Sequence, residues 1–255
     1  MGKFDNDHLF VEALELPAAP KRSTRGGGEP TVLDQLKSES EQAIVVGSDI
    51  ISFAKGISAD LRGDISKCTL LSQLAATKQV PAREEVEAWY NVYFDTLTHL
   101  GWVAQERGFS EYTESGDNFE AHKAVLQVAA TVFGPAAGAY ALVQSTLSAM
   151  ADTSDEPWFT LFQRESQGAR AGRFQISVAE PAEGDATILS VMAFNLEARS
   201  NLTQILFFKF RSSDVTLRHS SGKVSVDREQ LAALRSLVAQ KVVDYQKSYI
   251  AALTI

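Results

Sequence analysis

A chain of 255 residues, of which 45% are hydrophobic and 22% charged, can bury a sizeable core and is ordinary for a globular protein. Its formal net charge of −8 and its pI near 5.1 exclude nucleic acid as an expected partner, because affinity for a phosphate backbone depends on clustered lysine and arginine. The single cysteine, Cys68, excludes an intramolecular disulfide framework, and its place in a helical pattern predicts a buried thiol.

Residues 1–30 are predicted to form an N-terminal arm and a flexible linker. The N-terminus has no apolar stretch of the kind a secretory signal needs, so we expect a protein made in the cytoplasm, whose export would need a non-classical route. The mixed segment that ends at Leu16 is expected to dock as an edge strand or a helical turn. Proline, glycine and basic residues from Pro17 onward predict the linker.

Residues 31–255 are predicted to form a single α+β domain, which begins with a helical, bundle-like part over 31–172. The best-formed helical stripes cover residues 58–77 and a longer stretch that opens at Pro81. The tripeptide Arg62-Gly63-Asp64 falls inside the first stripe. We therefore do not expect it to act as the exposed loop motif that adhesion receptors read.

The hydrophobic period changes to 2 after Arg173, which predicts an antiparallel β-meander of about four to five strands over 173–226. Residues 202–210 are apolar on both faces, so they are expected to form the centre of this sheet. Asp227 and Gln230 have the spacing of a capping box. A long C-terminal helix over 227–255 should begin there and pack on the sheet.

Residues 124–151 are the segment of greatest functional interest, because they include no charged side chain. A run of about 20 apolar residues can cross the hydrocarbon core of a bilayer as a helix. Gly134-Pro135 near the middle, with many alanine and small polar residues, makes this run only moderately hydrophobic. Two interpretations follow: two buried central helices that meet at Gly134-Pro135, or a segment kept inside a soluble fold and released at a bilayer as a helical hairpin.

The second interpretation predicts a set of residues in contact with a membrane or a protein partner, namely Val125, Val128, Val132, Phe133, Gly134, Pro135, Tyr140, Leu142, Val143 and Leu147. His122 falls on the apolar face that leads into the run, with Asp117 and Glu120 close in sequence. Imidazole changes charge between about pH 5 and 8. We hypothesise that low pH acts on these three residues, loosens the helix start and favours membrane contact.

Motifs that would name a reaction are missing from the sequence. The histidines have no zinc-ligand spacing, and neither a nucleophile elbow, a Rossmann fingerprint nor a P-loop is present, so we expect no metal and no cofactor. Asp95 and His99 stand one helical turn apart, where a solvated pair is the favoured interpretation. The acidic loop 106–117 could supply paired carboxylates, although such loops are usually only solvated.

The sequence therefore favours a non-catalytic protein that binds a protein partner or a membrane surface. In its stronger form it is a membrane-active, toxin- or effector-like factor that uses residues 124–151, and the alanine-rich composition suggests a bacterial source. Two alternatives stay open. One is a cytosolic scaffold or oligomer component, and the other is an enzyme of unrecognised type with a site in the acidic loop 106–117.

Overall fold

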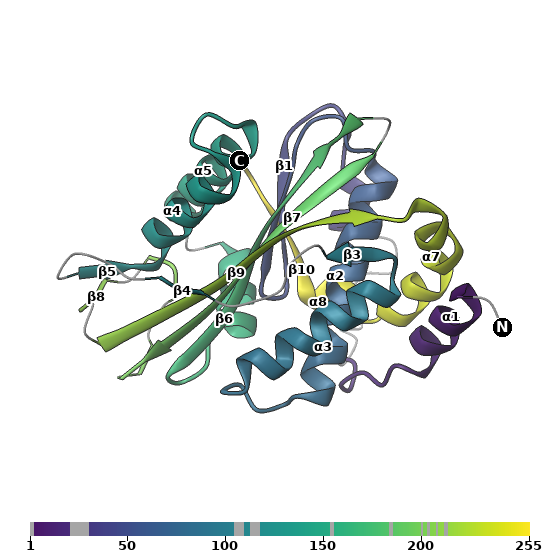
Figure 1. Cartoon of the computed structure of the whole chain (residues 1–255), viewed down its shortest axis with the longest axis horizontal. Coiled ribbons are helices and arrows are strands. Elements are labelled where there is room, and N and C mark those ends of the chain that lie inside the picture. The colour runs from purple at the N-terminus through teal and green to yellow at the C-terminus, as the bar shows by residue number, and fades with distance from the viewer. Residues whose placement is uncertain are drawn as a thin grey trace.

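An eight-stranded sheet lies between two layers of helices (Figure 1) in the computed structural model, which describes residues 3–20, 31–104, 110–112, 118–153, 156–183, 186–199, 201–202, 205–207, 209–211 and 214–255. The strands of this sheet are β1 (Gln42–Val46), β2 (Asp49–Phe53), β3 (Trp102–Ala104), β4 (Ser110–Tyr112), β6 (Ala171–Pro181), β7 (Thr187–Ala198), β9 (Val215–Val226) and β10 (Ile250–Leu253).

The strand order is β10-β1-β2-β6-β7-β9-β3, with β4 also paired to β9. Strands β2 and β6 run parallel, and the other pairs in this sheet are antiparallel. Two further strands, β5 (Asn118–Glu120) and β8 (Lys209–Arg211), form a separate two-stranded sheet. The long pairings of β6, β7 and β9 supply the frame on which both helical layers pack.

The tight turn between β1 and β2 depends on Gly47. Its φ of +56° lies in the left-handed region, and an added Cβ would collide with the side-chain oxygen of Gln73. Gln73 in turn accepts a hydrogen bond from the backbone N–H of Ser48 at 3.0 Å and donates one to Val46 O at 2.8 Å. The turn is thus fixed to the helix that covers it.

Alternation along the strands sends side chains to two separate cores. On one face, Ile51 and Phe53 pack under α1 (Lys3–Ala13), α2 (Ala59–Gln79), α3 (Val86–His99) and α7 (Arg228–Val242). On the other, Phe174 and Ile176 pack under α4 (Ala121–Phe133), α5 (Gly138–Asp152) and α6 (Pro157–Ser166). Figure 1 shows the two layers on opposite sides of the strands. A 3-10 turn (Val32–Gln35) and the short α8 (Gln246–Tyr249) complete the chain.

Several sequence predictions are confirmed. The protein is a mixed α+β fold. The region expected to hold a meander of about four to five strands contributes three antiparallel strands to the main sheet, β6, β7 and β9. Asp227 caps α7, because its side chain accepts hydrogen bonds from the backbone N–H groups of Glu229 and Gln230. Cys68 is buried at 1% exposure. The tripeptide Arg62-Gly63-Asp64 is buried inside α2.

The arrangement differs from the prediction in several places. Strands β1 and β2 occupy part of the region expected to be helical, since a short run that is apolar on both faces fits a buried strand as well as a helix. The expected C-terminal helix over 227–255 ends at Val242, and β10 then joins the edge of the sheet beside β1. The prediction that residues 202–210 form the central strand of the sheet was also wrong.

Of that expected strand, residues 205–207 form bends, and Lys209–Arg211 belongs to the small sheet with β5. Ile205 and Leu206 are nevertheless buried, against the α4–α5–α6 layer. The three middle strands of the main sheet are instead β2, β6 and β7. Burial on both sides does not by itself require a central strand, because a loop under a helical layer gives its side chains the same surroundings.

Candidate functional site

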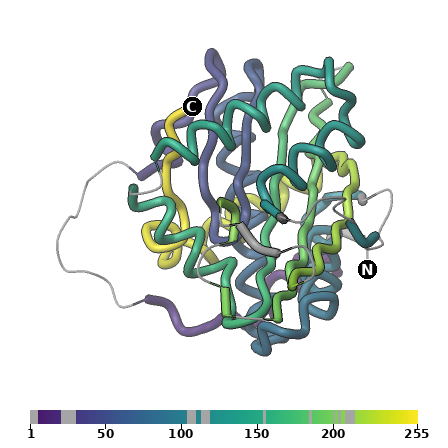
Figure 2. The backbone as a smooth tube through the Cα atoms, turned by 90° about the vertical axis from the view of Figure 1, so that its left-hand side faces the viewer, coloured from purple at the N-terminus to yellow at the C-terminus, as the bar shows by residue number. Residues whose placement is uncertain are grey.

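Residues 124–151, the uncharged run, form a helical hairpin on the face of the sheet opposite α2 and α3. Helix α4 ends at Gly134, whose φ of +83° terminates it, and Pro135 prevents the helix from continuing. Helix α5 then begins at Gly138 and packs back against α4. Figure 2 looks onto this side of the molecule, where the two teal helices pass in front of the strands. The expected break at Gly134-Pro135 is thus confirmed.

The inner face of the hairpin is apolar and fully packed. Val125 and Val128 of α4, with Leu142, Val143 and Leu147 of α5, are each at most 3% exposed and belong to the core on this face of the sheet. Of the remaining residues expected to contact a membrane or partner, four are partly exposed, namely Val132, Phe133, Gly134 and Tyr140, and Pro135 is exposed. The structure therefore collects the whole set on one hairpin, with its valines and leucines mostly inward and its two aromatic residues, Phe133 and Tyr140, partly exposed.

The outer face of the hairpin is polar without being charged. Its exposed positions include Gln127 and Thr131 on α4 and Gln144, Ser145 and Ser148 on α5. The charged residues of these helices lie only at the two ends, Lys123 near the start of α4 and Asp152 at the end of α5. The interpretation as two buried central helices holds for the inner face only, since the hairpin also has a solvent side. On that side the usual lysine and glutamate are replaced by uncharged groups.

Polar contacts between described residues join the hairpin to the body, among them the following three. The hydroxyl oxygens of Ser52 on β2 and Thr146 on α5 are 2.9 Å apart in the buried core. The Tyr112 hydroxyl of β4 donates a hydrogen bond to the side-chain oxygen of Gln127 on α4. At the start of α4, the backbone N–H of His122 donates to Leu206 O at 3.1 Å. Sequence reasoning missed Ser52 and Thr146, because a single hydroxyl in an apolar run gives no sign of its distant partner.

His122 is satisfied by its surroundings. Its Nδ1 lies 3.2 Å from Leu206 O, and its Nε2 lies 3.5 Å from a carboxylate oxygen of Glu120. Lys123 donates to the other oxygen of Glu120 at 3.0 Å. The structure thus brings His122 and Glu120 together, whereas Asp117 lies outside the described residues. The hypothesis that low pH acts on these residues stays a prediction.

The remaining candidate sites are a metal site, the Asp95–His99 pair and the acidic loop 106–117. Within the described residues, no three His, Cys, Asp or Glu side chains gather in a way that could hold a metal ion. Of the Asp95–His99 pair, Asp95 is exposed, and His99 Nδ1 lies 2.8 Å from Asp7 Oδ1 on α1. Of the acidic loop 106–117, only residues 110–112 are described, and they form β4. Loop residues 106–109 and 113–117, like linker residues 21–30, lie outside the described residues.

No protein-family model matches this chain, and no curated protein matches its sequence. Similar solved structures include a delta-endotoxin, with 10% identity, a TM-score of 0.41 and coverage of 82% of this chain and 90% of that one. The Evf virulence factor has 7% identity, a TM-score of 0.36 and coverage of 98% and 91%. The activated Cyt2Ba monomer from Bacillus thuringiensis subsp. israelensis has 12% identity, a TM-score of 0.29 and coverage of 66% and 87%.

Proposed function

We propose that this chain is a non-catalytic membrane-binding protein, whose α4–α5 hairpin leaves the sheet and lies in the interfacial region of a bilayer. The observation that carries the proposal is the lack of charge on both faces of the hairpin between its two ends. An exposed helix normally carries ionised side chains, which are costly to dehydrate. Here the outer face presents hydroxyls and amides, and the inner face presents aliphatic side chains.

The lengths of the two helices favour an interfacial position over a span. At about 1.5 Å per residue, α4 and α5 are about 20 and 22 Å long, whereas a hydrocarbon core is about 30 Å thick. None of the helices in the described part of the chain combines the length and hydropathy needed to cross a membrane. An amphipathic hairpin can instead bury its aliphatic face at the boundary between headgroups and acyl chains.

Release of the hairpin has a consequence for the sheet. The side chains beneath it, among them Phe174, Ile176 and Phe194, are at most 1% exposed and would lose their cover. An apolar sheet face of this kind is unstable in water. The released state should therefore form only at the bilayer surface, where lipid can replace the hairpin as the cover.

A reversible cross-link between hairpin and sheet tests the proposal. Ser52 and Thr146 have hydroxyl oxygens 2.9 Å apart, so the double variant Ser52→Cys/Thr146→Cys places two thiols where a disulfide can form. The native Cys68 is fully buried and should not interfere. We expect the oxidised variant to stay unbound in a flotation assay with phosphatidylcholine vesicles, with and without phosphatidylglycerol, and to bind after reduction. Equal binding by the oxidised and reduced forms would contradict hairpin release.

Charges placed on the outer face provide a second test. Gln144→Glu and Ser148→Glu change exposed positions of α5, so folding should be little affected. In the bound state these positions lie among the lipid headgroups, where an added carboxylate is partly dehydrated. Binding to neutral vesicles should therefore fall, by about tenfold for a penalty of about 1.4 kcal/mol. Gln79→Glu adds the same charge to an exposed position of α2, on the opposite layer, and should leave binding unchanged. Equal losses from both layers would indicate a general charge effect.

A further inference from the structure

Asp49 is a buried acid in the seam between the sheet and the α2–α3 layer. It is the first residue of β2 and is 0% exposed, and it shares a strand face with Ile51 and Phe53. Its Oδ2 accepts a hydrogen bond of 2.9 Å from the hydroxyl of Ser177 on β6. Its Oδ1 has neither a hydrogen-bond partner nor contact with solvent. A carboxylate with one oxygen left bare in this way is costly to ionise.

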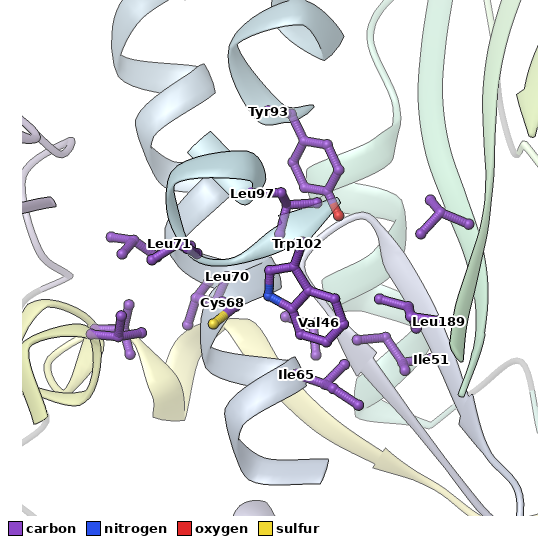
Figure 3. Packing of buried hydrophobic residues seen from close by; sticks show 14 of the residues in the cluster. Val46, Ile51, Ile65, Cys68, Leu70, Leu71, Tyr93, Leu97, Trp102 and Leu189 are labelled. Carbon is purple, nitrogen blue, oxygen red and sulfur yellow. The ribbon is translucent and has the colours of Figure 1, made fainter. Parts of the chain in front are cut away.

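Neighbouring polar groups in the seam are also incompletely satisfied. Gln175 is the register partner of Asp49 on β6, and its side-chain Nε2 makes no hydrogen bond. The hydroxyl of Tyr93 on α3 likewise makes none, and neither atom touches solvent. Figure 3 shows Tyr93 reaching from its helix toward the strands that carry Ile51 and Leu189. These groups would all gain hydrogen bonds if water entered the seam.

The charged and titratable groups around Asp49 do not neutralise it. Tyr90 and Tyr93 face it from α3, and burial raises the pKa of both phenols. Arg173 on β6 is engaged elsewhere, with its guanidinium 4.3 Å from the ring centre of Trp89. No ion pair to Asp49 occurs among the described residues. Burial accordingly raises the pKa of Asp49 to about 7, against the opposing effect of the Ser177 hydroxyl and the backbone N–H of Ile50.

We propose that protonated Asp49 keeps the α2–α3 layer closed on the sheet, and that loss of this proton opens the layer and admits water to the seam. In the closed state the bare oxygen can be tolerated as part of a neutral carboxyl group. In the open state water solvates the carboxylate and can also reach Gln175 and Tyr93. This opening takes place on the face of the sheet opposite the α4–α5 hairpin, so it does not depend on membrane binding.

The direction of the pH effect follows from the two states of the acid. In a hydrated state Asp49 has its ordinary pKa of 3.8, and in the closed state its pKa is about 7. The stabilisation of the closed state is complete below pH 3.8 and is lost as the pH rises through about 7. Between these limits the opening equilibrium constant should rise about tenfold per pH unit, and above pH 7 it should level off.

Cys68 is a built-in reporter of this opening. It lies on α2, is 1% exposed and packs in the same core as Tyr93, as Figure 3 shows, and burial raises its pKa to about 12. The experiment measures the rate at which 4,4′-dithiodipyridine labels Cys68 in the native full chain, divided by the rate in urea-unfolded chain at the same pH. This ratio removes the intrinsic pH dependence of the thiol. We expect protection to fall about tenfold per pH unit between about pH 5 and 6.5.

Variants separate Asp49 from other titrating groups. Asp49→Asn mimics the neutral acid and should abolish this slope. Asp60→Asn changes an exposed acid on α2 and should keep the wild-type slope. Ser177→Ala removes the hydrogen bond that lowers the pKa of Asp49, so the pH above which Cys68 labelling no longer rises should move upward. This variant tests the proposal even if Asp49→Asn does not fold.

Two results would overturn the proposal. One is flat wild-type protection across this pH range, or a slope that survives in Asp49→Asn. The other concerns the effect of urea on the labelling rate. A local opening exposes less surface than global unfolding, so its rate should depend less steeply on urea; a dependence as steep as that of global unfolding at every pH would contradict the proposal.

Discussion

Arg235 on α7 holds the carboxylate of Asp64 on α2 with three hydrogen bonds, of 2.6, 3.0 and 3.1 Å. Asp64 is 4% exposed, whereas the Arg235 side chain is 47% exposed. The pair therefore joins two helices of the same layer, with the acid inside and the cation at the rim. Asp64 also ends the Arg-Gly-Asp tripeptide, so its carboxylate is fully committed to the fold and is not presented to a receptor.

Replacing Asp64 by asparagine should weaken the contact between α2 and α7. The amide keeps the shape of the side chain but loses the charge that pairs with Arg235, while the half-exposed guanidinium can return to water. We expect the free energy of unfolding to fall by about 1 to 2 kcal/mol, measured by urea denaturation. The Asp95→Asn variant, at an exposed position of α3, should change it by less than about 0.5 kcal/mol.

Arg62 should be far more sensitive, since it is 0% exposed and its guanidinium donates to four oxygens. Three acceptors are backbone carbonyls, those of Ser40, Ala54 and Ile57, and the fourth is the side chain of Gln42. Arg62→Lys cannot reproduce this planar set of donors and leaves buried carbonyls unpaired. We expect a loss of at least about 3 kcal/mol in the free energy of unfolding by urea denaturation. A loss below about 1 kcal/mol would contradict this role.

The free energy of global unfolding should also depend on the ionisation of Asp49. Because its folded pKa of about 7 lies above the unfolded value of 3.8, ionisation penalises the native state at neutral and higher pH. Asp49→Asn should therefore be more stable than wild type above pH 7, by an amount on the order of 4 kcal/mol less the cost of an imperfect amide fit. The difference should shrink as the pH falls toward 4. Urea denaturation at pH 4 and pH 8 measures both ends.

The sequence predicted what depends on local periodicity and little of what depends on distant partners. The period of 2 in β6 and β7 and the cap at Asp227 could be found because neighbouring residues carry the signal. Strands β1 and β2 could not, since their pairing with β10 and β6 joins segments far apart in the chain.

The same limit applied to the candidate site. The lack of charge over residues 124–151 was visible in the sequence, and so was the break at Gly134-Pro135. Which face of each helix points inward was not visible, because alanine, serine and threonine occur on both faces. The side chains that attach the hairpin to the body, above all Ser52 and Thr146, become recognisable only when the fold places them together.

The Ser52–Thr146 contact gives a last prediction, about the balance between the closed and released hairpin. Thr146→Val removes one hydroxyl while keeping the shape of the side chain. It costs the closed state the hydrogen bond between Ser52 and Thr146, whereas the released state has no such bond to lose. The penalty of about 1 to 2 kcal/mol falls on the closed state alone, so vesicle binding should rise about five- to thirtyfold. Flotation with phosphatidylcholine vesicles measures the change.

Thr131→Val is the matched control for that substitution. Thr131 is an exposed residue of α4 whose hydroxyl bonds to the carbonyl of Gln127 within the same helix, so its loss affects the closed and released states alike. Any gain in binding that it shares with Thr146→Val reports the greater apolarity of the hairpin. Only the excess in Thr146→Val reports the broken contact with the sheet. If the two variants bind equally, the Ser52–Thr146 contact does not restrain the hairpin, and release must be limited by the aliphatic packing of α4 and α5 instead.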